Sequence, residues 1–416
     1  MEAGKRGVDR CGLNPGKISL KSRVCVICLA VAATLTSLLV QPPIALAATP
    51  SSCVLKWGTV DTPGGFPQRN DIRYGSEINA LAASPNGMII YALDIPNSSS
   101  GLVTRAGIWR SGDGGISWSQ RPTQWLARTT SQPAPVFPVA ALAIAPDNPD
   151  LVAAVCMSAA GDRRREVYYS EDGGTNWYYS GAVPYLYGPD EQIGSIVISA
   201  PYTYRETQVR DIIVGSRNPD SVSAQEGEVY VLRYPGIAGW QAQGFTGGDI
   251  LALQPSPSYA VDASLVVTAC TLQRTYINLG SRDIGANACY WNTAPGYPVE
   301  LCTPDQAGGS SSGKNRVITG SLALPADFDG NSGAKRIIFS ACDSNGSAAG
   351  TSRPLDDMYR LNDTIVTRLA IPTAKPRISS IAYSGSTVSG KLLAGCVGAD
   401  RVTGAANVFF TGDPLA

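Results

Sequence analysis

The sequence contains no histidine among its 416 residues. Without an imidazole there can be no Ser–His or Cys–His nucleophile pair, no three-histidine zinc site and no histidine general base. Charged residues are also scarce, at 16%, and they balance, with 33 basic against 33 acidic side chains. Because domains that bind nucleic acid usually carry an excess of basic residues, we expect no nucleic-acid partner. The absence of histidine by itself excludes the most common hydrolase mechanisms.

Apolar residues and turn-forming residues are abundant. Apolar residues make up 44% of the chain, which excludes a disordered protein and is enough for a large core. The sequence also has 44 glycines and 29 prolines. Since these residues interrupt helices and form turns, the composition favours many short strands over long helices.

Residues 1–47 predict a signal peptide. A basic segment ends at Arg23, an uncharged and mostly apolar run covers residues 24–40, and Ala45-Leu46-Ala47 fits the small-x-small pattern that signal peptidase cleaves. We therefore expect export to the cell surface or beyond, with a mature domain at residues 48–416. The alternative is that the apolar run stays uncleaved as an anchor, and in both cases the membrane is contacted only through this segment.

Six internal repeats follow the predicted signal peptide. Each begins with an apolar-x-x-apolar-apolar pattern and continues, after a turn, into a second apolar segment. The first residues of the six copies, spaced by 54 to 67 residues, are Ile78, Val139, Ile193, Ile250, Val317 and Ile378. Because each repeat holds several short apolar segments separated by turns, the sequence predicts an all-β protein with one sheet per repeat.

Seven cysteines follow residue 47. Four of them end the second strands of repeats, namely Cys156, Cys270, Cys342 and Cys396. Equivalent positions in neighbouring repeats lie too far apart for a disulfide, so we predict that these four are small buried side chains. Cys289 and Cys302 lie close together in the sequence, and an oxidising compartment permits a disulfide between them across a hairpin.

Two repeats share the motif Ser-x-Asp-x-Gly-x-x-Trp. Its residues are Ser111, Asp113, Gly115 and Trp118 in the first copy and Ser170, Asp172, Gly174 and Trp177 in the second. This motif is the Asp-box, and over roughly residues 53–416 the chain resembles the Asp-box (BNR-repeat) β-propellers. That family includes sialidases, the sortilin ectodomain and the photosystem II assembly-factor propellers. The second copy departs from the family pattern at Asn176, where serine or threonine is usual.

The resemblance implies a single propeller of about six four-stranded blades. It places the Asp-box at the turn between the third and fourth strands of a blade, where the aspartate accepts hydrogen bonds from turn amides and the tryptophan packs between sheets. We therefore expect Asp113 and Asp172 to be structural, not catalytic. The last repeat is one strand short, and we predict that residues 53–60 supply this strand and close the ring. The alternative is part of a propeller with seven or more blades.

The catalytic residues of the sialidases have no clear counterparts. The Phe/Tyr-Arg-Ile-Pro motif of that family is missing, and Arg73 is the nearest early arginine, in a different context. Glu228 beside Tyr230 can be posed as a nucleophile pair, but nothing in the spacing selects it. We therefore predict a non-catalytic protein that binds a protein or glycan at the cell surface. The alternatives are a sialidase-like glycoside hydrolase and a structural component of the cell envelope, such as a surface layer.

The candidate ligand-binding residues are Tyr179, Tyr185 and Tyr187. They lie in the connection from one repeat to the next, and such connections tend to reach the ligand-binding face of a propeller. Tyrosine side chains suit contacts with sugar rings or protein partners. Packing within the core is the alternative interpretation for these residues.

One short acidic segment is a weak calcium candidate. Asp327, Asp329 and Asn331 alternate around a glycine, as at the start of a calcium loop. The twelfth position of such a loop would hold a glutamate, whereas this sequence has Ile338 there. An ordinary turn is the alternative, and apart from calcium we expect no cofactor.

Overall fold

The computed structural model divides the chain into two units, Met1–Gly58 and Thr59–Ala416. It describes residues 76–96, 107–122, 139–157, 164–218, 226–236, 238–271, 274–302, 317–344, 358–369, 377–397 and 407–415. All of these belong to the second unit. The predicted signal peptide (1–47) and the predicted closing strand (53–60) lie outside the described residues and remain predictions.

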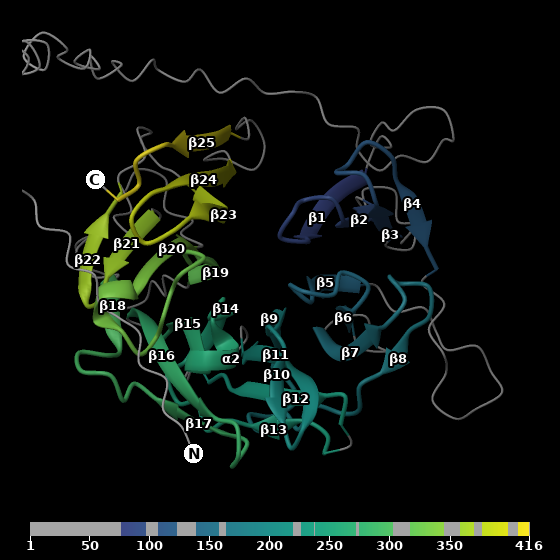
Figure 1. Ribbon diagram of the computed structural model, residues 1–416, viewed down its shortest axis with the longest axis horizontal. Helices are drawn as coiled ribbons and strands as arrows, with labels where there is room; N and C mark the ends of the chain where they lie inside the picture. Colours follow the sequence, from purple (N-terminus) through teal and green to yellow (C-terminus); the bar gives the residue numbers. More distant parts are fainter. Residues whose placement is uncertain are drawn as a thin grey trace, which may run out of the picture. The chain divides into compact units, whose positions relative to one another are not determined.

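The second unit is an all-β propeller of six antiparallel sheets, the blades, which follow one another in chain order around an axis (Figure 1). The first strand of each blade packs beside the first strand of the next, from β1 through β5, β9, β14 and β19 to β23. The predicted all-β, six-bladed fold is therefore confirmed.

The first three blades each hold a meander of four strands. The first contains β1 (Ser76–Ala83), β2 (Ile90–Pro96), β3 (Gly107–Ser111) and β4 (Ser119–Arg121). The second contains β5 (Val139–Ile144), β6 (Val152–Met157), β7 (Arg164–Ser170) and β8 (Tyr178–Tyr179). The third contains β9 (Gln192–Ile198), β11 (Thr207–Arg217), β12 (Val229–Tyr234) and β13 (Gln241–Ala242), with a short β10 (Tyr202–Tyr204) paired to the start of β11.

The last three blades vary at their outer edges. The fourth contains β14 (Asp249–Pro255), β15 (Ser264–Cys270), β16 (Thr275–Asp283), β17 (Ala288–Trp291) and β18 (Val299–Cys302). The fifth contains β19 (Val317–Ala323), β20 (Ile337–Ser344), β21 (Met358–Asn362) and β22 (Ile365–Arg368). The described part of the sixth contains β23 (Arg377–Gly385), β24 (Gly390–Val397) and β25 (Asn407–Thr411).

A bulge at the same position of every first strand explains the repeat pattern. The register with the second strand shifts one residue after the repeat's first apolar residue, for example between Ile78 and Ala80 and between Val139 and Ala141. The equivalent shift occurs in the other four first strands. Because a bulge inserts one residue, side chains three apart, such as Val139 and Leu142, face the same side and are both buried. In this protein the apolar-x-x-apolar spacing therefore indicates a strand that contains a bulge.

Helix is almost absent from the described residues. It consists of α2 (Tyr259–Asp262), between the first two strands of the fourth blade, and the 3-10 turn η2 (Gly333–Lys335), at the equivalent place in the fifth. In the described part of the chain, no helix is both long and apolar enough to cross a membrane.

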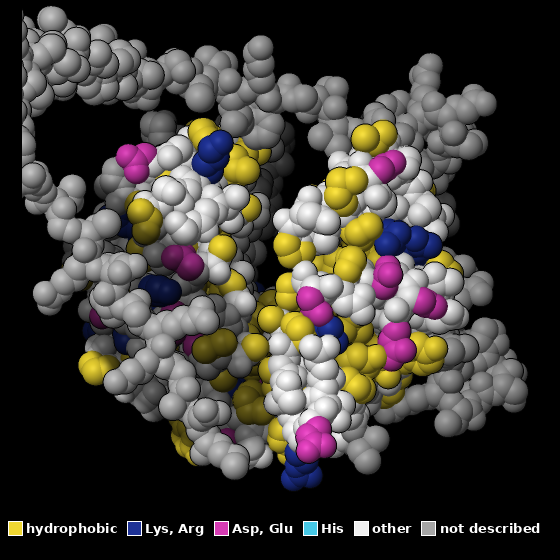
Figure 2. All heavy atoms as spheres, in the orientation of Figure 1, with side chains coloured by type: hydrophobic (Ala, Val, Ile, Leu, Met, Phe, Trp, Pro, Cys, Tyr) yellow, Lys and Arg dark blue, Asp and Glu magenta, His cyan; other side chains and the backbone are white. Residues whose placement is uncertain are grey.

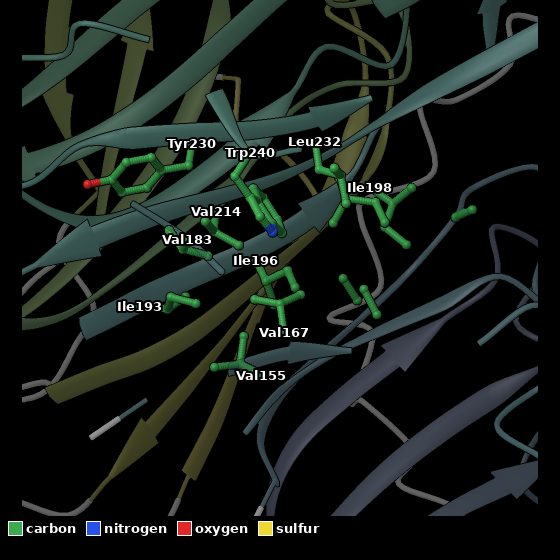
Figure 3. Close-up of a cluster of buried hydrophobic side chains, with 14 of the residues drawn as sticks. Val155, Val167, Val183, Ile193, Ile196, Ile198, Val214, Tyr230, Leu232 and Trp240 are labelled. Atoms are coloured by element: carbon green, nitrogen blue, oxygen red, sulfur yellow. The ribbon is translucent and has the colours of Figure 1, made fainter. Parts of the chain in front are cut away.

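Hydrophobic cores lie between neighbouring blades. The core between the second and third blades takes Val155 and Val167 from one sheet and Ile196 and Val214 from the other (Figure 3). Trp240, at the outer edge of the third blade, is also buried in it, and its indole Nε1 donates to Ser180 Oγ of the second blade at 3.1 Å. Each blade is therefore held to the next by packing between residues that are distant in the sequence.

The structure corrects the predicted Cys289–Cys302 disulfide. Cys289 is a free, buried thiol on β17, where it lies opposite Arg282 of β16, while Cys302 on β18 lies opposite Thr275. Seven residues of extended strand separate those two positions on β16, or about 23 Å, far beyond the reach of a disulfide. The two cysteines are close in the sequence, but they pair with opposite ends of β16.

The prediction that the strand-end cysteines are small buried side chains is confirmed for those whose side chains the structure describes. Cys156, Cys270 and Cys342 are buried at or near the ends of β6, β15 and β20, whereas the side chain of Cys396 lies outside what the structure describes. Burial raises the pKa of the Cys289 thiol to about 12, so this side chain is a neutral thiol at physiological pH.

Candidate binding site

The two Asp-box turns use their aspartates within the turn itself. In the first, Asp113 Oδ1 accepts a hydrogen bond from the backbone N–H of Ser117 at 2.8 Å, and its Oδ2 accepts one from the Ser117 hydroxyl at 2.6 Å. The Ser111 hydroxyl donates to Asp113 Oδ1 and accepts from the N–H of Gly115, each at 2.8 Å. Gly115 has a φ of 94°, a left-handed conformation that glycine adopts without strain.

The second turn repeats this arrangement with one substitution. Asn176, the departure from the family pattern, replaces both contacts of Ser117: its backbone N–H lies 2.8 Å from Asp172 Oδ1 and its amide Nδ2 lies 2.6 Å from Oδ2. In both turns the tryptophan Nε1 donates at 3.0 Å to the carbonyl of the box glycine, Gly115 or Gly174. The carboxylates thus serve the turns, as the family resemblance implies.

The hydrogen bonds in the first box predict a pH effect. Those from Ser117, followed by the one from Ser111, lower the pKa of Asp113 to about 2. Because the folded pKa lies below the unfolded value of about 3.9, the carboxylate stabilises the turn fully above pH 4 and ceases to do so as the pH falls through 2. We expect Ser117→Ala to raise this pKa, as measured by NMR titration of the Asp113 carboxyl carbon.

Ser119→Ala is the matched control, since the Ser119 hydroxyl donates to the Arg110 carbonyl and does not contact Asp113. A pKa that stays near 2 in Ser117→Ala would contradict the assignment.

The three predicted ligand-binding tyrosines have different surroundings. The hydroxyl of Tyr185 donates to the carbonyl of Arg165, and the Arg165 guanidinium covers the ring with its carbon 4.0 Å from the ring centroid. Tyr187 is half-buried and its N–H donates to Glu191 Oε2 at 2.7 Å. Tyr179 packs against the core on the opposite side of the second blade. Tyr179 and Tyr185 therefore lie on opposite sides of the second blade, and a role of the three tyrosines in binding remains a prediction.

Several carboxylates lie fully inside the propeller. Glu191 is 0% exposed and its Oε1 accepts from the hydroxyl of Tyr230, also 0% exposed, at 2.7 Å. Glu228 is 2% exposed and its Oε1 accepts from the N–H groups of Val229 and Phe245 at 2.8 and 2.9 Å. Burial raises the pKa of Glu228. Tyr230 therefore pairs with Glu191 and not with its sequence neighbour Glu228, and these groups hold loops in place.

The two aspartates of the predicted calcium site make contacts in different places. Both Asp327 oxygens face the sixth blade, where the N–H and hydroxyl of Thr387 donate to them at 2.6 and 2.9 Å. Asp329 instead closes its own turn by accepting from the N–H of Asn331 at 2.9 Å. Among the described residues, no three histidine, cysteine, aspartate or glutamate side chains form a group that could hold a metal ion. Calcium binding remains a prediction. In the structure, the carboxylates of Asp327 and Asp329 accept hydrogen bonds from neighbouring loop residues.

Three other tyrosines meet at the outer margin of the second and third blades, and we name this group the tyrosine surface: Tyr169, Tyr178 and Tyr234. Tyr169 of β7 lies directly opposite Tyr178 of β8, with ring centroids 5.6 Å apart. Tyr234 ends β12 of the third blade, and its ring centroid is 5.1 Å from that of Tyr169. Tyr178 is 43% exposed, so the group presents an aromatic face to solvent.

Polar groups flank the tyrosine surface. The Tyr234 hydroxyl donates to the carboxylate of Glu171, which belongs to the second Asp-box turn. Arg210, opposite Tyr234 across the β11–β12 pair, is held by Asp147 with a 3.1 Å bond from Nε to Oδ1. Burial and the bond to Glu171 raise the pKa of Tyr234, so its hydroxyl stays protonated at neutral pH. Figure 2 shows hydrophobic side chains with acidic ones beside them over the region of β7 and β8.

Strand alternation positions these rings. Val167 and Tyr169 of β7 face the third blade, and Val167 is fully buried in the shared core, while Tyr169 lies at the margin of that core. Sequence reasoning selected the tyrosines after the box and missed this group. The available signal was the pair of tyrosines on each side of the second box, at 168–169 and 178–179. The contact between Tyr234 and Tyr169 could not be predicted, because the two residues lie in different repeats.

Comparisons with known proteins do not assign the chain to a family. No protein-family model matches the sequence, and no curated protein is significantly similar to it. Among solved structures, an ancestral enzyme of glycoside hydrolase family 74 has a TM-score of 0.47 and 16% identity, over 85% of this chain and 40% of that one. The family 74 xyloglucanase from Xanthomonas campestris has a TM-score of 0.46 and 11% identity, over 80% and 47%.

The sialidase of Trypanosoma rangeli has a TM-score of 0.43 and 12% identity, over 81% of this chain and 54% of that one. The chain thus spans about half or less of the length of these three enzymes. At such low identity and TM-score these likenesses assign neither an active site nor a substrate to this chain.

Proposed function

We propose that this chain is an exported, non-catalytic β-propeller that binds a glycan at the cell surface through the tyrosine surface. The observation that carries the proposal is the group of the exposed Tyr178 with the half-buried Tyr169 and Tyr234, contributed by two blades and flanked by a carboxylate and an arginine–aspartate pair. Tyrosine rings offer flat apolar faces, and their hydroxyls and the flanking charges offer hydrogen bonds, which is the combination that a sugar chain requires.

The buried carboxylates support a non-catalytic role. Glycoside hydrolases need two carboxyl groups that reach the substrate, usually about 5–9.5 Å apart. Here Glu191, Glu228, Asp211 and Asp249 are each no more than 2% exposed. The hydrogen bonds of Glu191 and Glu228 are directed to loop amides and hydroxyls, and not to solvent. Among the described residues, these carboxylates act as structural acceptors.

A glycan array with mass readout of the spotted sugars tests the proposal on the purified protein. We expect binding without trimmed products, and Tyr178→Ala should weaken it by about tenfold or more, because an aromatic side chain at the centre of an interface typically contributes 1–2 kcal/mol or more. Tyr290→Ala is the matched control, since Tyr290 is 55% exposed but lies on β17 of the fourth blade.

Each alternative outcome has a distinct meaning. Trimmed products would overturn the non-catalytic assignment and favour a glycoside hydrolase. An empty array, followed by capture of a polypeptide partner whose binding Tyr178→Ala abolishes, would replace the glycan by a protein. Equal loss of binding in Tyr178→Ala and Tyr290→Ala would remove the tyrosine surface as the site.

A further inference from the structure

A polar cavity of ≈ 210 Å³ lies between the fourth and fifth blades, apart from the tyrosine surface. The fourth blade contributes Ser264, the first residue of β15, Ser281 near the end of β16, and Thr293 after β17. The fifth blade contributes Asn331 and Arg336, on either side of η2. Thr293 and Asn331 are exposed, so the cavity opens to solvent on their side.

A close approach of the two blades shapes this cavity. A side chain at Gly330 would place a Cβ 2.0 Å from Ser264 Oγ, so only glycine allows the loop of the fifth blade to lie against β15. The N–H of Gly330 donates to the buried carboxylate of Asp262 at 2.9 Å, which fixes the loop. Asn331, the next residue, is thereby held at the cavity wall. This segment is the one that the sequence offered as a calcium loop.

Arg336 is the charged group of the cavity. The residue is only 8% exposed, and its Nη1 donates to Asp363. Its Nε is buried and has no hydrogen-bond partner in the described part of the chain. The guanidinium carbon also lies 5.8 Å from the centroid of the Tyr297 ring, and a guanidinium has five N–H donors, so Arg336 can serve these neighbours and still line the cavity. The Nε itself has almost no accessible surface, so the guanidinium meets the cavity through its other nitrogens.

Charge and size select the class of ligand. Asp363 already balances Arg336, and the Asp262 carboxylate lies behind the loop, so the cavity has no surplus of positive charge to hold an anion. Its other polar groups are the hydroxyls of Ser264, Ser281 and Thr293 and the amide of Asn331, with Leu279 as an apolar wall. The volume corresponds to about seven water molecules. One neutral, hydroxylated six-membered ring fits this combination.

We propose that this cavity binds a single neutral sugar residue. The hydroxyls, the Asn331 amide and the Arg336 guanidinium would bond the oxygens of the sugar, and Leu279 would contact its C–H face. The ligand class rests on the proposed glycan-binding function, while the site is separate: it lies between the fourth and fifth blades, and the tyrosine surface between the second and third. A sugar chain that ends in this residue could occupy both only if it spans two blades.

Saturation-transfer NMR and titration with the methyl glycosides of glucose, galactose, mannose and N-acetylglucosamine test the proposal. We expect one of them to bind with a Kd on the order of 1 mM, as suits a ligand of this size. Thr293→Trp, which fills the mouth of the cavity from an exposed position, should weaken binding by about tenfold or more, a loss of about 1.4 kcal/mol. Thr203→Trp, at an exposed position on β10, is the matched control and should bind normally.

A second variant tests the cavity without filling it. Asn331→Ala removes an exposed amide and should weaken the same glycoside several-fold. The proposal is overturned if none of the four glycosides gives a signal, if Thr293→Trp leaves binding unchanged, or if inorganic phosphate binds instead and Thr293→Trp prevents it. Binding of a glycoside together with an empty glycan array would retain the cavity and reject the tyrosine surface, while the reverse result would retain only the tyrosine surface.

Discussion

Asp211→Asn is expected to lower the free energy of unfolding by about 3–5 kcal/mol, because it leaves a buried guanidinium without its counter-charge. Asp211 and Arg282 are both 0% exposed in their side chains, and Arg282 Nη2 lies 3.2 Å from Asp211 Oδ2. The hydroxyls of Tyr202 and Tyr259 each donate to the same carboxylate at 2.7 Å. Denaturant unfolding followed by circular dichroism measures the loss.

The buried pair connects two blades. Asp211 and Tyr202 belong to the third blade, whereas Tyr259 and Arg282 belong to the fourth. Glu300→Gln is the control, because the Arg274–Glu300 pair has a similar distance of 2.7 Å but side chains that are 50% and 33% exposed. Exposed pairs of this kind contribute at most about 1 kcal/mol. Equal losses in the two variants would show that burial of the pair is not what matters.

Trp177→Ala is the second substitution with a large expected effect. Trp177 is 1% exposed and belongs to the core between the first and second blades, together with Tyr91, Leu93 and Val152. Removing a buried tryptophan side chain typically costs about 3–5 kcal/mol, since both the apolar contacts and the filled volume are lost. Guanidinium unfolding, followed by far-ultraviolet circular dichroism, measures the change in the free energy of unfolding.

Trp118→Ala separates the role of the core from that of the turn. Trp118 occupies the same Asp-box position and makes the same 3.0 Å bond from Nε1 to the box glycine, but its side chain is only half-buried. We expect a clearly smaller loss of stability for Trp118→Ala than for Trp177→Ala. If both variants lose the same amount, the hydrogen-bonded turn and not the packing between blades would be the larger contribution.

Asn176 stands where the motif usually has serine or threonine, yet it makes the same two contacts to the aspartate. Asparagine supplies both a backbone N–H and a side-chain donor at the distance where serine supplies an N–H and a hydroxyl. The second box therefore keeps the full set of contacts to its aspartate. A pattern search that demands serine or threonine would reject a turn that is structurally equivalent.

The sequence by itself determined the repeat architecture. The apolar pattern at Ile78, Val139 and their equivalents, the glycine-rich turns and the two Asp-boxes are local features, and strands, bulges and turns are set by local sequence. The strand-end cysteines followed from the same alignment, because equivalent positions in a repeat have equivalent surroundings. The position of Asp113 and Asp172 in turns could also be predicted, since their hydrogen-bond partners lie within four residues.

Only the tertiary structure decided what lies between blades. Whether Cys289 could reach Cys302 depended on the strand register of β17 and β18 along β16, which sequence proximity does not reveal. The tyrosine surface, the Asp211–Arg282 pair and the cavity at Arg336 each join residues of adjacent blades that are far apart in the sequence. Their chemistry arises from side chains that meet only when neighbouring sheets pack, so no local pattern in one chain records it.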